Sequence, residues 1–258
     1  MNLILSYDGT FEGFLTCVFT SYERKAEEIA TIRKKEYANE TFFSTIEVVI
    51  SDLKKAERVW DGIKKNTSPS GRFNIYKAFL SEFADIEDSL FGYIRYAFSS
   101  PVKIDTDFTN NNILKVTQIA KSVGREKHRM DAFVRFRLTK DDIYFATIEP
   151  DFNVLPLNIS HFKSRYADQR WLIYDLRRDY GIFYDLYNVD TVKLENTKDV
   201  NNTSRECLYF NEGEFEFQKL WRNYFKSTNI ESRRNMKLHI KHVPKRYWKY
   251  MSEKLLDI

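Results

Sequence analysis

The chain has 258 residues, of which 43% are hydrophobic and 30% charged, and its formal net charge is +4. This composition is sufficient for a folded core and excludes an intrinsically disordered tail. The chain has only 8 glycines and lacks the G-x-G-x-x-G and P-loop patterns, which argues against a nucleotide-binding fold built on glycine-rich loops.

Residues 1–124 are predicted to be mainly helical. A short strand over residues 2–7 precedes a turn at residues 8–10 that caps a helix, in which apolar residues recur at a spacing of three and four. The further elements that we expect are a strand at 45–50, a loop at 101–112, and helices at 53–63, 73–83, 86–98 and 113–123. Gly124 suits the C-terminal cap of the last helix.

Residues 125–204 predict an antiparallel sheet, which forms a domain of its own or one domain with residues 1–124. We expect strands at 132–138, 143–148, 170–176, 182–186 and 191–194, with a short helix at 159–166. The strings LIYDL (residues 172–176) and IFYDL (residues 182–186) are nearly identical, and the turn-like residues between them favour an antiparallel hairpin.

Residues 205–258 predict a basic helical segment. The expected elements are an Asn-rich linker at 195–205 and helices at 215–225, at about 229–241 and from Pro244 onward. A capping box, in which the Thr228 hydroxyl and the Glu231 carboxylate accept backbone N–H groups, begins the second helix. The fold class is therefore α+β, with a helical N-terminal half, an antiparallel sheet in the middle and a basic helical C-terminal segment.

The two cysteines, Cys17 and Cys207, are too few for a disulfide scaffold, an iron–sulfur cluster or a thiolate zinc site. We expect no metal and no cofactor. The N-terminus lacks a basic leader with a cleavable apolar stretch, and no run approaches the roughly 18 apolar residues of a membrane span. The sequence therefore predicts a cytoplasmic protein with no membrane partner.

Charge is distributed unevenly along the chain. Residues 218–258 contain 11 Lys and Arg but only 3 Asp and Glu, a net charge of +8, so residues 1–217 carry −4. A basic end on a mildly acidic body indicates a polyanionic partner, most often nucleic acid. An ordinary solvated helical surface is the alternative interpretation.

The basic segment contains the clearest candidate binding residues. Arg233, Lys237 and Lys241 are spaced to line one face of a helix, while Tyr247 and Met251 belong to an apolar inner face of the last helix. The cations that we expect to hold phosphates are Arg233, Arg234, Lys237, Lys241, Lys245, Arg246 and Lys249. The alternative is that these cations only keep the surface soluble.

Two other polar clusters are candidates for chemistry. Glu126 and His128 have the side chains of a general acid and base, since His titrates near neutral pH and a carboxylate can orient it. His161 and Arg165 share a helix face just before Asp168, and such a cluster can hold a phosphate or a base edge. The structural alternatives are a solvated charge cluster and polar residues around a buried tryptophan.

Five long strings resemble a bacterial family of probable DNA metabolism proteins. They are YDGTFEGFLTCVF (7–19), REKHRMDAFVRFR (125–137), YFATIEPDFNVLPL (144–157), HFKSRYADQRWLIYDLRRDYGIFYD (161–185) and LWRNYFKSTNIESRRNMKLHIKHVPKRYWKYM (220–251). The resemblance implies a radical-SAM protein, encoded nearby, as a partner in DNA repair or modification. Some members carry a C-terminal domain that resembles uracil-DNA glycosylase, and this chain is expected to be the form without it.

Three functions are open at this point. The leading hypothesis is a DNA-binding accessory protein that works with a radical-SAM partner in DNA repair or modification. The second is an enzyme that acts directly on damaged DNA through Glu126, His128, His161 and Asp168. The third is a protein–protein scaffold whose basic end binds an acidic partner.

Overall fold

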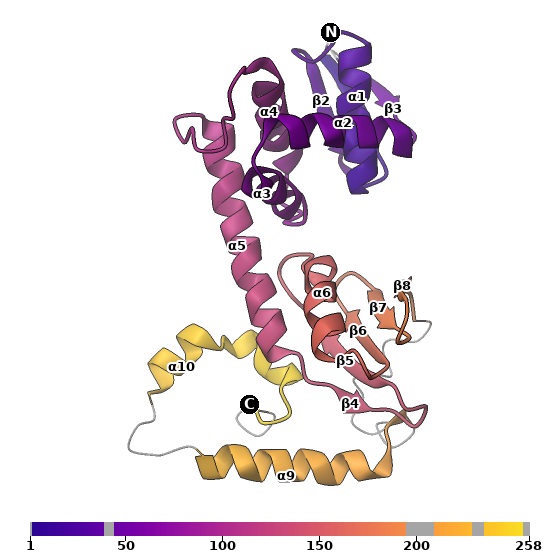
Figure 1. The fold of residues 1–258 in the computed structure, drawn as a ribbon, viewed down its shortest axis with the longest axis vertical. Helices are drawn as coiled ribbons and strands as arrows, with labels where there is room; N and C mark the ends of the chain where they lie inside the picture. The colour runs from indigo at the N-terminus through magenta and orange to yellow at the C-terminus, as the bar shows by residue number, and fades with distance from the viewer. Residues whose placement is uncertain (1, 39–43, 195–208, 229–234, 255–258) are drawn as a thin grey trace. The chain divides into compact units, whose positions relative to one another are not determined.

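The computed structural model describes residues 2–38, 44–194, 209–228 and 235–254, and Figure 1 draws them as a ribbon. The chain divides into two compact units, Met1–Gly124 and Arg125–Ile258. Helices and strands are mixed in an α+β arrangement, as the sequence predicted. Within the described residues, no helix is long and apolar enough to cross a membrane.

The first unit contains a small parallel sheet that the sequence only partly indicated. Its strand order is β2 (Ala30–Lys34), β1 (Asn2–Tyr7), β3 (Ser44–Val48), and both pairings are parallel. β2 was not predicted, because its only fully buried side chain is Ile32 and it therefore shows no hydrophobic pattern. The chain returns from β1 to β2 through a helix, and such a crossover makes the two strands parallel.

The other described elements of this unit are helices. They are α1 (Phe11–Glu23), the short η1 (Lys35–Tyr37), α2 (Leu53–Asn66), α3 (Pro69–Phe79), α4 (Ile86–Ser99) and the first part of α5 (Asn111–Phe133). The predicted cap of α1 is confirmed, since the Thr10 side chain accepts a hydrogen bond of 3.0 Å from the backbone N–H of Gly13. Leu5, Phe14 and Ile63 are fully buried in this unit.

α5 is longer than the sequence predicted, and Gly124 does not end it. A mid-helix glycine costs about 1 kcal/mol relative to alanine, which is too little to stop a helix whose buried residues continue on both sides. Val123 and Met130 are both buried, and the helix runs to Phe133. The expected strand at 132–138 is therefore wrong, and only β4 (Arg137–Leu138) remains of it.

The sheet of the second unit is mixed rather than antiparallel. Its order is β4, β5 (Tyr144–Ile148), β6 (Trp171–Asp175), β7 (Tyr180–Tyr184), β8 (Val189–Val192). β5 and β6 run parallel, because α6 (Leu155–Arg165) connects them as a crossover, while the other neighbours are antiparallel. The predicted hairpin is confirmed as β6–β7, with Leu172 opposite Phe183.

The C-terminal segment contains α9 (Glu212–Thr228), α10 (Met236–His242) and the 3₁₀ helix η4 (Lys245–Tyr250). α10 begins later than predicted, because Asn235 has an extended backbone and its side chain accepts a hydrogen bond from the N–H of Leu238. The last helix is a short 3₁₀ turn that nevertheless buries Tyr247 and Trp248, as its predicted apolar face requires. Several predicted features lie outside the described residues. They are the linker at 195–205, residues 229–231 of the capping box, Cys207, Arg233 and Arg234.

Candidate nucleic-acid interface

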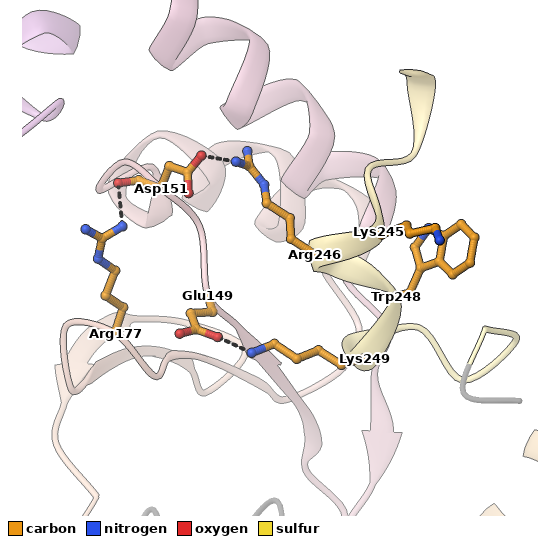
Figure 2. A pocket seen from close by; sticks show the side chains of 7 residues that line it. All are labelled: Glu149, Asp151, Arg177, Lys245, Arg246, Trp248 and Lys249. Carbon is orange, nitrogen blue, oxygen red and sulfur yellow. Dashed lines mark hydrogen bonds and ion pairs between the residues drawn. The ribbon is translucent and has the colours of Figure 1, made fainter. Parts of the chain in front are cut away.

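A pocket of about 710 Å³ in the second unit is lined by four basic side chains, two carboxylates and one indole. We call it the cationic pocket, and Figure 2 shows its residues, which are Glu149, Asp151, Arg177, Lys245, Arg246, Trp248 and Lys249. The lining therefore has an excess of two positive charges over its carboxylates.

The place of the pocket follows from the parallel pairing of β5 and β6. Glu149 and Asp151 come directly after β5, and Arg177 comes just after β6. The carboxyl ends of adjacent parallel strands lie at one edge of a sheet, and this is the edge at which open α/β sheets bind ligands. η4 closes the other side and supplies the remaining four residues of the lining.

Arg177 is held by the tight turn between β6 and β7. The Asp175 carboxylate is fully buried and accepts the backbone N–H groups of Arg177, at 3.0 Å, and of Arg178, at 3.2 Å. Burial raises the pKa of Asp175, and the Arg178 guanidinium offsets only part of this effect. The exposed Arg177 side chain donates to the backbone oxygen of Asp151 at 3.2 Å, and no carboxylate of the described residues forms an ion pair with it.

Two of the predicted phosphate-binding residues already have carboxylate partners. Lys249 forms an ion pair with Glu149, which also accepts a hydrogen bond of 2.5 Å from the Tyr250 hydroxyl. These two donors hold the pKa of Glu149 below its usual value. Arg246 pairs with Asp151 and, at 2.8 Å, with Glu126.

The predicted acid–base pair of Glu126 and His128 is not assembled. Glu126 is 1% exposed and accepts hydrogen bonds from the Tyr247 hydroxyl, at 2.5 Å, and from the backbone N–H of Asp151, at 3.0 Å. His128 is exposed, and residues two apart on a helix point to different sides. Glu126 therefore fastens the C-terminal segment to α5, while burial and the bond to Glu126 raise the pKa of Tyr247.

Other predicted cations remain accessible. Lys237 and Lys241 are exposed on α10, and Lys245 is exposed on η4 with its amino group 5.8 Å from the Trp248 ring. Lys237 and Lys241 are one turn apart and share a face of the helix. In the part of the chain that the structure describes, none of these three lysines forms an ion pair with a carboxylate.

His161 and Arg165 line a second, separate pocket of about 500 Å³, which we call the aromatic cleft. Its lining comes from residues 131, 132 and 134–136, from residues 161, 162, 165, 166 and 169, and from Tyr144 and Trp221. The lining therefore includes residues from both strings that contain the candidate catalytic residues, 125–137 and 161–185. Glu126, His128 and Asp168 are not part of its lining, so the four proposed catalytic residues are not brought together.

Sequence reasoning missed Glu149, Asp151 and Arg177. Available signals were the acidic residues of Glu-Pro-Asp directly after a predicted strand and the paired arginines of the predicted hairpin. Among the described residues, no group of three or more His, Cys, Asp and Glu side chains is placed to hold a metal ion.

One protein-family model, described as a domain of unknown function (DUF4130), matches residues 84–253, which is more than half of the chain. The match includes every residue of the cationic pocket and of the aromatic cleft. No curated protein and no solved structure matches the chain.

Proposed function

Because the chain belongs to the DUF4130 family, a domain of unknown function, we propose a function from its own residues: it is a cytoplasmic DNA-binding accessory protein that acts in DNA repair or modification. The observation that carries the proposal is the surplus of accessible cations on α10, on η4 and in the cationic pocket. Phosphates supply most of the affinity of non-specific nucleic-acid binding, and lysine and arginine side chains neutralise them.

The ion pairs indicate which cations are available to bind phosphate and which are already neutralised. Lys237, Lys241, Lys245 and Arg177 form no ion pair with a carboxylate within the described residues, so a phosphate binds them without breaking one. The charge of Arg177 also helps to lower the pKa of Glu149, so a phosphate at Arg177 competes with that carboxylate. Arg246 has a structural role in the site and does not bind phosphate, because Glu126 and Asp151 already neutralise it. The phosphate sites therefore centre on the accessible lysines and on Arg177.

The proposed partner is a radical-SAM protein. Support for it comes from the resemblance of the five sequence strings to the family of probable DNA metabolism proteins, since two distant cysteines leave radical chemistry to another chain. Size-exclusion chromatography of the two purified proteins together is the direct test. Separate elution at every concentration tried would refute this part of the proposal and leave DNA binding intact.

The DNA part is tested by fluorescence polarisation with single-stranded and duplex oligonucleotides between about 50 and about 200 mM salt. We expect affinity to fall steeply with salt, because bound cations release counterions from the phosphates. A Lys237→Gln/Lys241→Gln/Lys245→Gln variant should bind all sequences more weakly. It should also flatten the slope of log K against log salt by about 1 for each phosphate that the variant no longer neutralises.

The matched control removes the same charge elsewhere. Lys54, Lys65 and Lys115 are exposed in the first unit, and a triple Gln variant of these lysines changes the net charge equally. It should retain the wild-type salt slope. Equal losses in the two triple variants would refute the assigned surface, and affinity that ignores salt would refute phosphate binding altogether.

A further inference from the structure

The aromatic cleft combines rings and uncommitted polar groups in one cavity. Five of its lining side chains are aromatic, and they are Phe136, Tyr144, Phe162, Tyr166 and Trp221. Its volume, about 500 Å³, falls in the range typical of small-molecule sites. The cleft lies within the second unit, so its walls belong to one compact part of the chain.

The rings are fixed in place rather than loosely exposed. Phe136 and Tyr166 pack edge to face, with centroids 5.3 Å apart and an interplanar angle of 75°. Trp221 is 41% exposed, yet its indole N–H donates to the Glu253 carboxylate at 3.1 Å, and its ring stacks on Tyr224. An exposed ring that is already ordered loses little conformational freedom when a planar ligand stacks on it.

Glu253 is itself anchored. Arg135, which also lines the cleft, forms an ion pair of 2.7 Å with it. Burial acts to raise the pKa of Glu253, but the hydrogen bond and charge of Arg135 outweigh it and leave that pKa below its usual value. The carboxylate is thus charged at neutral pH and holds Trp221 at the cleft.

Asp131 and Arg135 of the lining are already paired, but three other polar side chains of the cleft have unused hydrogen-bonding capacity. His161 Nε2 is buried and has no hydrogen-bond partner among the described residues, an arrangement that is costly in a folded protein. Gln169, in the loop after α6, offers a carboxamide with both a donor and an acceptor. Arg165 is exposed, and its guanidinium lies 5.8 Å from the Tyr166 ring.

We propose that the aromatic cleft binds one unpaired nucleobase of a nucleic-acid strand. The rings stack on the face of the base, Gln169 and His161 form hydrogen bonds with its edge, and Arg165 binds the adjoining phosphate. Stacking on aromatic side chains and bonding to an exposed base edge are how proteins recognise unpaired bases. This inference rests on the proposed function, because the strand is brought to the cleft by phosphate binding.

The test separates base binding from phosphate binding. We compare a single strand of about 15 nucleotides with an abasic strand of the same length, which has the same phosphates and no bases. The wild type should bind the base-bearing strand about tenfold or more tightly, given the usual contribution of one stacked base. The ratio of the two affinities should not change with salt, since both strands release the same counterions.

Two variants locate the effect. Gln169→Ala removes a hydrogen-bonding partner of the base edge, and Ala132→Trp places a large ring at the mouth of the cleft from an exposed position, where it displaces no buried side chain. Both should reduce the affinity ratio toward one and leave abasic binding unchanged. Gln118→Ala, at an exposed glutamine of the first unit, is the matched control and should keep the full ratio.

The outcomes distinguish the two proposals. Equal wild-type affinity for both strands, falling with salt, overturns the nucleobase inference and leaves phosphate binding standing. If neither strand binds, the proposed function is refuted, and the cleft is then judged by titration with free nucleosides, followed by the NMR signal of the Gln169 amide. An unmoved signal overturns the inference by itself.

Discussion

Replacement of Glu126 by Gln tests whether this buried carboxylate fastens the C-terminal segment to the end of α5 within the second unit. The carboxylate is 1% exposed, and it accepts from the Tyr247 hydroxyl at 2.5 Å, from the Asp151 N–H at 3.0 Å and from Arg246 at 2.8 Å. Glu126→Gln keeps the size of the side chain but removes its charge. The remaining hydrogen bonds then lose their charge-assisted strength.

The expected cost follows from these interactions. Breaking a fully buried ion pair costs about 3–5 kcal/mol. The Arg246 side chain is 41% exposed and keeps Asp151 as a partner, so water and that second carboxylate reduce the loss. We therefore expect the free energy of unfolding to fall by about 1–3 kcal/mol. With a denaturant dependence of about 1–3 kcal/mol per molar urea, the urea midpoint should fall by about 1 M.

The assay is urea unfolding followed by tryptophan fluorescence, in which Trp248 reports on η4 next to Tyr247. Glu57→Gln, at an exposed position of α2, is the control and should stay within about 0.5 kcal/mol of the wild type. A Tyr247→Phe variant completes a double-mutant cycle with Glu126→Gln, and we expect a coupling energy above about 0.5 kcal/mol. An unchanged midpoint in Glu126→Gln, or strict additivity in the cycle, would show that the buried hydrogen bonds do not hold the segment.

Three further predictions concern Glu149, Gly181 and Cys17. Because Lys249 holds the pKa of Glu149 below its usual value, the resulting stability is present at neutral pH and is lost as the pH falls through that lowered pKa. Urea midpoints of Glu149→Gln should thus fall less than those of the wild type between neutral pH and about pH 3, and parallel profiles would contradict this. A Cβ at Gly181 would lie 2.9 Å from the backbone oxygen of Ile173, so Gly181→Ala should lower the free energy of unfolding by about 1–3 kcal/mol, and a wild-type urea midpoint would argue against the close approach. Burial raises the pKa of Cys17 to about 12, so iodoacetamide should modify it only after unfolding, as peptide mass spectrometry would show; rapid labelling of the folded protein would refute the burial.

The sequence by itself determined the features that depend on near neighbours. One such feature is α1, with its apolar spacing and its Thr10 cap. Another is the β6–β7 hairpin with its matching pentapeptides. Each is determined by residues that lie close together in the sequence. The charge division is also a property of sequence alone. These predictions succeed because the atoms that decide them are close together along the backbone.

The tertiary structure decided which distant segments meet. The parallel pairing of β5 and β6 sets the edge where the cationic pocket forms, and no local pattern specifies that pairing. Arg246 and Lys249 looked free in the sequence, yet Asp151 and Glu149, about a hundred residues earlier, neutralise them. An ion pair between exposed segments leaves no periodicity in either one, because it depends on the packed geometry of both. Which cations are accessible to a phosphate is therefore decided by the fold, whereas their number is decided by the sequence.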